Sequence, residues 1–208
     1  MIALNQQLRI GVLALQGDFR EHLRAVEDLG ARGVAVRLPK DLDNLDGLII
    51  PGGESTVMGK LMVVYELVEP LRARIAAGLP VWGTCAGLIL LARATDNAIA
   101  GQPLLAAMDI RVARNAFGAQ RESFETELAV PALGKKPVHA IFIRGPVVEN
   151  AGPGVEVLAR LDAAHGSDIV AVRQGSLLGT AFHPEVTEDT RFHQYFLGVV
   201  SAARAAVA

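Results

Sequence analysis

The sequence predicts a three-layer α/β/α sandwich with a mainly parallel central sheet and an antiparallel extension. In the first half of the chain, short apolar runs alternate with segments of helical periodicity, which is typical of a parallel sheet covered by helices on both faces. Beyond about residue 108, β-type runs follow one another with little helix between them. The 208 residues, 51% of them hydrophobic, are enough for one large core. We therefore expect a single domain over residues 1–208.

The N-terminal part begins with the βα pattern. Residues 9–17 form an apolar run that ends in a glycine, as expected of a strand buried on both faces. A helix follows, with its apolar face at Phe19, Leu23, Val26 and Leu29, Asp18 as its N-cap and Gly30 as its stop. Residues 33–38 and 46–53 are two further strand candidates. Residues 57–75 have a helical pattern with an expected break at Glu69–Pro70.

The only cysteine of the chain lies in the stretch LPVWGTCAGLILLA, Leu79–Ala92. A strand-like run precedes Cys85, and a helical run that ends near Arg93 follows it. The pattern Gly-x-Cys-x-Gly is typical of a nucleophile elbow, a sharp strand-to-helix turn whose close backbone contacts tolerate only small neighbours. A buried cysteine that merely fills a gap in the core is the alternative, but it does not require glycines on both sides.

The C-terminal half is predominantly β. We predict strands within residues 108–115, 120–130, 138–148, 155–161, 168–175 and 177–185, with a hairpin turn at residues 174–176. That hairpin delivers the tripeptide His-Pro-Glu to a strand end. The last segment has acidic residues at its start and then Phe192, Tyr195, Phe196, Val199 and Val200 at helical spacing, which predicts a packed C-terminal helix.

Composition excludes several classes of function. The net charge of −2 with dispersed basic residues gives no nucleic-acid footprint. A single cysteine excludes an internal disulfide framework and fits a reducing compartment. The first residues lack the features of a secretory signal, and the apolar runs are too short for a membrane span, so we expect a cytoplasmic protein. Neither metal-ligand spacing nor a phosphate or dinucleotide motif occurs, so we expect no metal and no cofactor.

Among the five histidines of the chain, only His183 has a local arrangement that suggests a catalytic base. Pro184 favours an extended backbone at His183, and residues two apart on an extended segment point the same way. Glu185 can then orient the imidazole while its other nitrogen faces a thiol. Since the thiolate is the reactive form of cysteine, we interpret Cys85, His183 and Glu185 as nucleophile, base and orienting carboxylate.

Acyl transfer also requires backbone donors that stabilise an oxyanion. The stretch IIPGGES ends a predicted buried strand, so Gly52 and Gly53 should lie at the same sheet edge as Cys85. Glycines let backbone N–H groups approach a substrate closely. We expect the amides of Gly53 and Ala86 to form the oxyanion hole.

The segments PGGES, GTCAG and HPE, in this order and at these separations, resemble those of the triad-type (class I) glutamine amidotransferases. The stretches LQGDFREH, PGGESTVMGKL, RNAFGAQRESFE, FIRGP and AFHPEVTED are similar to one family of that class, the glutaminase subunits of pyridoxal 5'-phosphate synthases. The resemblance implies a flavodoxin-like sandwich that hydrolyses L-glutamine and hands ammonia to a separate synthase subunit. It also implies a set of substrate-binding residues: Gly52, Gly53, Glu54, Arg114, Ile143 and Arg144.

Three positions depart from the expected pattern: Val57, Ala116 and Gly145. They lie outside the triad and bear on the pocket and the partner contact. Two alternatives stay open, namely a glutaminase that serves another synthase and a non-catalytic or redox-sensing relative of the fold.

Overall fold

The computed structural model describes residues 7–96, 101–114 and 123–207. Within these residues ten strands form one curled sheet in the order β2-β1-β3-β4-β12-β11-β9-β6-β5, with β10 paired to β11. Their bounds are β1 (Arg9–Leu13), β2 (Arg32–Val36), β3 (Gly47–Ile50), β4 (Val81–Thr84), β5 (Ala92–Asp96), β6 (Met108–Ala113), β9 (Val147–Ala151), β10 (Glu156–Arg160), β11 (Ile169–Gln174) and β12 (Leu177–Thr180).

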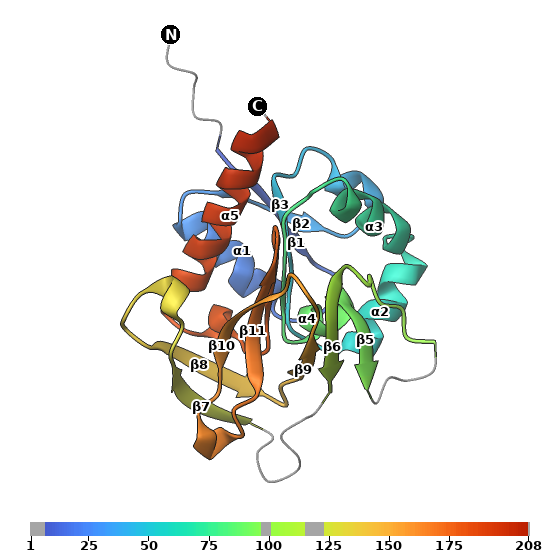
Figure 1. The fold of residues 1–208 in the computed structure, drawn as a ribbon. Helices are drawn as coiled ribbons and strands as arrows, with labels where there is room; N and C mark the ends of the chain where they lie inside the picture. Colours follow the sequence, from blue (N-terminus) through green and yellow to red (C-terminus); the bar gives the residue numbers. More distant parts are fainter. Residues whose placement is uncertain (1–6, 97–100, 115–122, 208) are drawn as a thin grey trace.

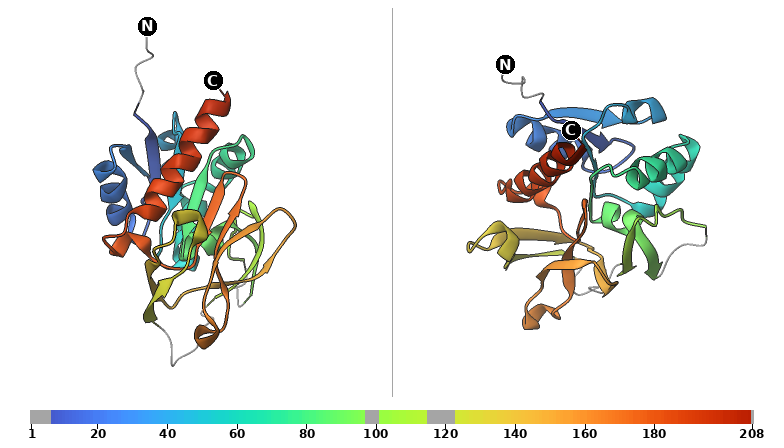
Figure 2. Two further views of the ribbon diagram at one scale, coloured as in Figure 1. Left: turned by 60° about the vertical axis from the view of Figure 1, so that its left-hand side comes forward. Right: turned by 45° about the horizontal axis from the view of Figure 1, so that its top comes forward.

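Helices cover both faces of this sheet (Figures 1 and 2). One face carries α1 (Phe19–Asp28) and α5 (Arg191–Val207), and the other carries α2 (Ser55–Val64), α3 (Val68–Ala76) and α4 (Ala86–Leu91). The neighbours from β2 to β12 pair in parallel, whereas β12, β11, β9 and β6 are joined by antiparallel pairs. The predicted fold class, a layered sandwich with an antiparallel extension, is confirmed.

A separate two-stranded sheet of β7 (Ser123–Leu128) and β8 (Val138–Ile143) lies beside the main sheet, near the start of α5 (Figure 1). The predicted run 138–148 is therefore divided between two sheets. It breaks at Arg144, whose φ of +47° turns the chain before β9. The predicted run 120–130 is described only from Ser123, where β7 begins.

Two further expectations about elements are wrong in position. The helical region breaks at Glu66, where φ is +55°, and not at Glu69–Pro70. Pro70 lies in the first turn of α3, where backbone N–H groups have no intrahelical acceptor and proline is tolerated. The helix after Cys85 ends at Leu91, and the chain continues as β5, which the sequence pattern did not indicate.

The core between the sheet and α5 is aromatic. Trp82, Phe182, Phe192 and Phe196 are at most 1% exposed. The ring centroids of Trp82 and Phe192 lie 6.2 Å apart in a stacked arrangement. This packing fixes α5 against β4 and β12, the two strands that precede the candidate catalytic residues. None of the helices in the described part of the chain is both long and apolar enough to cross a membrane.

Candidate active site

The turn between β4 and α4 is a nucleophile elbow with Cys85 at its apex. Cys85 has φ +46° and ψ −100°, a conformation that L residues rarely adopt. A Cβ at Gly83 would lie 2.4 Å from the Gly87 carbonyl carbon, and one at Gly87 would lie 2.0 Å from the Ile50 carbonyl oxygen. Both glycines are therefore required by close backbone packing, as the Gly-x-Cys-x-Gly pattern predicts.

Neighbouring strands bring the cysteine and the histidine together. β4 and β12 pair in parallel with Thr84 opposite Thr180, so the residues that follow them meet at one sheet edge. The Cys85 N–H donates to the Thr180 carbonyl at 2.8 Å. Three residues beyond Thr180, the chain reaches His183. The parallel pairing of two strands that are far apart in sequence thus creates the site.

His183 contacts both proposed partners. The Cys85 side chain lies close enough to raise the pKa of the imidazole, and His183 Nδ1 lies 2.8 Å from Glu185 Oε1. Glu185 contacts His183 as predicted, but the local backbone that brings them together differs from the expected one. Pro184–Val186 form a short 3₁₀ turn, so the carboxylate folds back onto the ring instead of lying along an extended strand.

Burial and charge act in opposite directions on His183. Desolvation lowers its pKa, but the hydrogen bonds and charges of Cys85 and Glu185 together raise it to about 10. Burial raises the pKa of Glu185, and the His183 contact acts against that rise. The imidazole is thus held in its protonated form at neutral pH, next to the thiol and the carboxylate.

The loop after β3 lies against this ring. A Cβ at Gly52 would come 2.3 Å from His183 Cε1, so only glycine fits there. The Gly52 carbonyl accepts from the Asp18 N–H at 3.3 Å, and Gly53 has φ +148°. The structure therefore brings Gly52 and His183 together at the edge that also carries Cys85. Ala86 follows Cys85 directly as the first residue of α4, where its N–H lacks an intrahelical acceptor.

Glu54 and Arg114, both predicted to bind substrate, form an ion pair. Arg114 Nη2 lies 3.2 Å from Glu54 Oε1, and Arg114 Nη1 donates to Gln102 Oε1 at 2.9 Å. The Glu54 carboxylate also caps α2 by accepting from the Thr56 and Val57 amides. Burial raises the pKa of Glu54, but these amides and Arg114 outweigh it and lower the pKa overall.

Ile143 and Arg144 lie at the end of β8. The link from β8 to the triad is a backbone bond, because the His183 N–H donates to the Ile141 carbonyl at 2.9 Å. Ile143 is 42% exposed, and Arg144 has φ +47°. Val57 and Gly145 lie within the described residues, whereas Ala116 lies outside them.

The segment after β1 contributes residues that were not predicted as part of the site. Gln16 Oε1 accepts from the Glu54 N–H at 2.8 Å. Asp18 occupies the N-cap position of α1, but its side chain makes no capping bond, and its Oδ2 lies 3.5 Å from His183 Nδ1. Asp18 is therefore the N-cap residue, as predicted, but its carboxylate lies beside the imidazole and does not bond the helix N-terminus. The stretch LQGDFREH, which contains Gln16 and Asp18, was noted only for its resemblance to a family, and it was the available signal for these two residues.

One group of potential metal ligands occurs in the described part of the chain. Ligand atoms of Asp18, His183 and Glu185 lie within 4.8 Å of one another. However, the nitrogen of this group, His183 Nδ1, is already hydrogen-bonded to Glu185 and is not free to bind a metal ion. We therefore interpret the two carboxylates as charge partners of one protonated imidazole.

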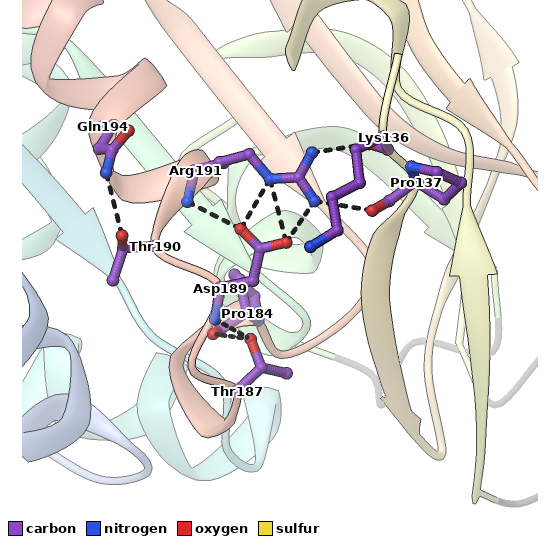
Figure 3. Close-up of polar contacts among 8 residues, drawn as sticks. All are labelled: Lys136, Pro137, Pro184, Thr187, Asp189, Thr190, Arg191 and Gln194. Atoms are coloured by element: carbon purple, nitrogen blue, oxygen red, sulfur yellow. Dashed lines mark hydrogen bonds and ion pairs between the residues drawn. The ribbon is translucent and has the colours of Figure 1, made fainter. Parts of the chain in front are cut away.

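The segment after Glu185 is anchored at the start of α5 (Figure 3). The Arg191 guanidinium donates to Asp189 and to the Lys136 and Pro137 carbonyls at 2.6 and 2.7 Å. Thr187 Oγ1 donates to the Pro184 carbonyl at 3.0 Å. These bonds tie the segment that follows His183 to α5 and to the loop before β8.

Comparison with known proteins agrees with this architecture. A solved structure described as a glutamine amidotransferase superposes with a TM-score of 0.85 and 49% identity over 92% of this chain and 98% of that chain. The structure of PurLQS from Thermotoga maritima shares the fold, with a TM-score of 0.64 at 18% identity over 93% of this chain and 99% of that chain. Fold and sequence together place the protein in the class of glutamine amidotransferases.

Within that class, the chain belongs to the SNO glutamine amidotransferase family, whose model matches residues 12–202. Curated relatives named pyridoxal 5'-phosphate synthase subunit PdxT are closely similar. The protein of Clavibacter sepedonicus is 59% identical over 93% of this chain and 91% of its own length. That of Frankia alni is 56% identical over 94% of this chain and 96% of its own length.

Proposed function

We propose that this chain hydrolyses L-glutamine to L-glutamate and ammonia through a thioester on Cys85. The observation that carries the proposal is the contact of the elbow cysteine with a buried His183–Glu185 pair, in a member of a glutamine amidotransferase family. Cys85 acts as the nucleophile, His183 as the proton donor and acceptor, and Glu185 as the orienting group.

The first half of the reaction releases ammonia. The Cys85 thiolate attacks the carboxamide carbon of glutamine, and the carbonyl oxygen becomes an oxyanion that accepts from the Gly53 and Ala86 amides. His183 Nδ1 is bonded to Glu185, so Nε2 is the nitrogen that gives its proton to the leaving amine. The C–N bond breaks, and ammonia and the thioester result.

In the second half, water attacks the thioester while His183 accepts its proton. The C–S bond breaks, glutamate leaves, and the thiolate–imidazolium pair is restored. One water is consumed for each glutamine. This sequence uses only groups of the chain and substrate, so the proposal requires neither a metal nor an organic cofactor.

The remaining predicted residues form the proposed glutamine pocket. The Glu54–Arg114 pair offers one anionic and one cationic group, which suit the α-amino and α-carboxylate groups of an amino acid. Gly52 packs directly against the His183 ring, so the reacting carboxamide would lie beside the Gly52–Gly53 backbone. Ile143 and Arg144 complete the pocket from the end of β8.

We further propose that the ammonia goes to the synthase subunit of pyridoxal 5'-phosphate synthase, in a hetero-oligomer and in the cytoplasm. The relatives that are 55–59% identical carry the name of one subunit of that enzyme and match the chain over nearly its whole length. A glutaminase that serves a different synthase is the second candidate, and the identity of the protein that co-purifies with the chain distinguishes the two.

The proposal is tested by measuring glutamate and ammonia release from glutamine, with and without the synthase subunit. A glutamine-mimicking electrophile should add a mass confined to Cys85, and glutamine should protect against it. Labelling of Cys85 without protection by glutamine, together with no ammonia release in the complex, would contradict the glutaminase assignment.

A further inference from the structure

A buried histidine pair lies directly behind the proposed triad. His22 of α1 and His193 of α5 are 0% and 1% exposed. His22 Nδ1 lies 3.0 Å from His193 Nε2, and His22 Nε2 lies 3.3 Å from Thr84 Oγ1. On the same side, His22 Nε2 lies 3.4 Å from Glu185 Oε2. The proposed mechanism uses neither histidine.

The histidine pair lies next to a carboxylate oxygen of Glu185 that lacks a hydrogen-bond donor. Its side chain is fully buried, and Oε1 is bonded to His183. Oε2 is buried as well and has no hydrogen-bond partner in the described part of the chain. A buried carboxylate oxygen without a donor is costly, because burial favours the protonated, neutral acid. In that acid form Glu185 would lose the negative charge that stabilises the His183 imidazolium.

The proton positions on the pair follow from burial and from its one shared hydrogen bond. Burial lowers the pKa of both histidines, that of His193 to about 4, so both are neutral at pH 7. If His22 carried its proton on Nδ1, two lone pairs, on His22 Nε2 and Glu185 Oε2, would face each other. His193 would then also bury an unpaired N–H at Nδ1, which has no partner.

The opposite arrangement avoids both problems. His193 carries its proton on Nε2 and donates it to His22 Nδ1, which forces the His22 proton onto Nε2. That proton is then available to the Thr84 hydroxyl, 3.3 Å from Nε2, and to Glu185 Oε2 at 3.4 Å. His193 Nδ1 keeps only a lone pair, which is less costly to bury than an N–H group.

We propose that His22, held by His193 in its neutral Nε2–H form, is a positioning residue that donates to Glu185 Oε2 and keeps the carboxylate ionised and aligned on His183. The inference rests on the proposed glutaminase function. It extends the triad into a buried chain of five side chains that ends at α5: Cys85, His183, Glu185, His22 and His193.

The other groups around Glu185 do not supply this donor. The Glu185 backbone N–H bonds its own carboxylate and lowers its pKa, but Oε2 still has no hydrogen-bond partner. Asp18 lies 3.5 Å from His183 Nδ1, and its carboxylate has no proton to donate; its negative charge raises the pKa of Glu185 further. The His183 charge opposes that rise, but its N–H is directed to Oε1. The Thr84 hydroxyl faces His22 Nε2. The donor that we infer for Oε2 is His22 Nε2 of α1, which lies 3.4 Å from it.

The test compares His22→Leu, which removes the donor, with His22→Gln, whose side-chain amide replaces the Nε2–H group. His22→Leu should lower kcat at least tenfold with KM changed less than about threefold. Its acid limb of kcat/KM should move to higher pH, because Glu185 then takes up a proton more readily. His22→Gln should restore most of kcat and the pH limb. His139→Leu, at an exposed histidine paired with Glu125, is the control and should stay near the parent.

Nitrogen NMR of the histidine rings in the wild-type chain provides a readout that does not depend on activity. The inference requires the Nε2–H form of His22 between pH 6 and 8, and the Nδ1–H form would overturn it even if the chain is an active glutaminase. Unchanged kcat and pH limb in a folded His22→Leu variant would overturn it too. If the wild-type complex releases no ammonia, the proposed function fails, and the ring NMR alone decides the inference.

Discussion

At the scale of single residues, the site depends on charged groups that are buried away from water. Cys85 is 6% exposed and His183 is 4% exposed, so the imidazolium is stabilised by its neighbours and not by solvent. The groups that stabilise the imidazolium are therefore side chains that single substitutions can remove. Two such substitutions separate the role of the nucleophile from that of the orienting carboxylate.

Cys85→Ser should abolish glutamine hydrolysis, because an alcohol ionises far less readily than a thiol and the site is built around a thiolate. The fold should survive, since the hydroxyl is smaller than the thiol and the elbow glycines are unchanged. Glutamate release and circular dichroism check the two statements. Activity near the parent level would rule out Cys85 as the nucleophile.

Glu185→Gln should lower the pKa of His183 from about 10, because the carboxylate charge is one of the causes that raise it. We expect kcat to fall by about tenfold or more, since the imidazolium loses its stabilising charge. Ring NMR and steady-state kinetics measure the two effects. Asp18→Asn is the matched control: its carboxylate lies 3.5 Å from the same nitrogen and is partly exposed. A larger loss in Asp18→Asn would make Asp18 the orienting group.

At the scale of elements, two packing contacts position the site. The elbow packs the first turn of α4 on β3 and β4 with no space for a side chain at Gly87. On the opposite face of the sheet, α1 and α5 meet through the buried contact of His22 and His193. Each of these two contacts leads to a prediction about the stability of the protein.

Gly87→Ala should be strongly destabilising, because its Cβ would lie 2.0 Å from the Ile50 carbonyl oxygen. Gly198→Ala in α5 is the matched control, since nothing lies within 4 Å of a Cβ there. That change should stabilise the protein by about 0.5–1 kcal/mol through helix propensity. Denaturant unfolding of both variants gives the comparison. Equal effects would mean that the elbow backbone can relax.

The histidine pair should make stability depend on pH. His193 has a pKa of about 4 when folded and an ordinary value of 6.5, so between these values only the unfolded chain binds the proton. The free energy of unfolding should therefore fall as the pH drops through this window. From pH 6 to 5, it should fall by about 1 kcal/mol more in the parent than in His193→Phe. Parallel curves for the two proteins would contradict this.

At the scale of the whole molecule, the site lies at one sheet edge where segments from distant parts of the chain meet. The Gly52–Gly53 peptide is held there by the Asp18 N–H, and Gln16 bonds the Glu54 amide. A contact with the segment after β1 would thus reach the predicted oxyanion hole through two hydrogen bonds. This arrangement suits control by a partner that binds near Gln16 and Gly17.

We therefore expect the isolated chain to be a poor glutaminase that its synthase partner activates. Loss of one oxyanion donor costs on the order of a hundredfold in kcat. A stimulation of roughly tenfold or more is therefore expected when the partner favours the conformation in which the Gly53 N–H points to the substrate. Glutamine hydrolysis at saturating glutamine, measured with and without the synthase subunit, checks this. Equal kcat values in the two assays would exclude activation by the partner.

The sequence by itself determined the layered α/β class, the elbow and the pairing of His183 with Glu185. These features depend on local rules: apolar runs that form buried strands, glycines where backbones touch, and two residues separated by one proline. The break at Glu66 escaped prediction because Pro70 appeared to be the stronger signal. β5 escaped because the apolar residues of Ala92–Asp96 are two alanines, which are depleted in strands.

Only the tertiary structure decided which distant groups meet at the site. The parallel pairing of β4 with β12 sets His183 beside Cys85, and the docking of α1 places the carboxylate of its N-cap residue, Asp18, next to the imidazole. The packing of α1 and α5 puts His22 and His193 behind Glu185. Such contacts join residues up to 171 positions apart. No periodicity along the chain encodes them, because they result from strand order and helix docking.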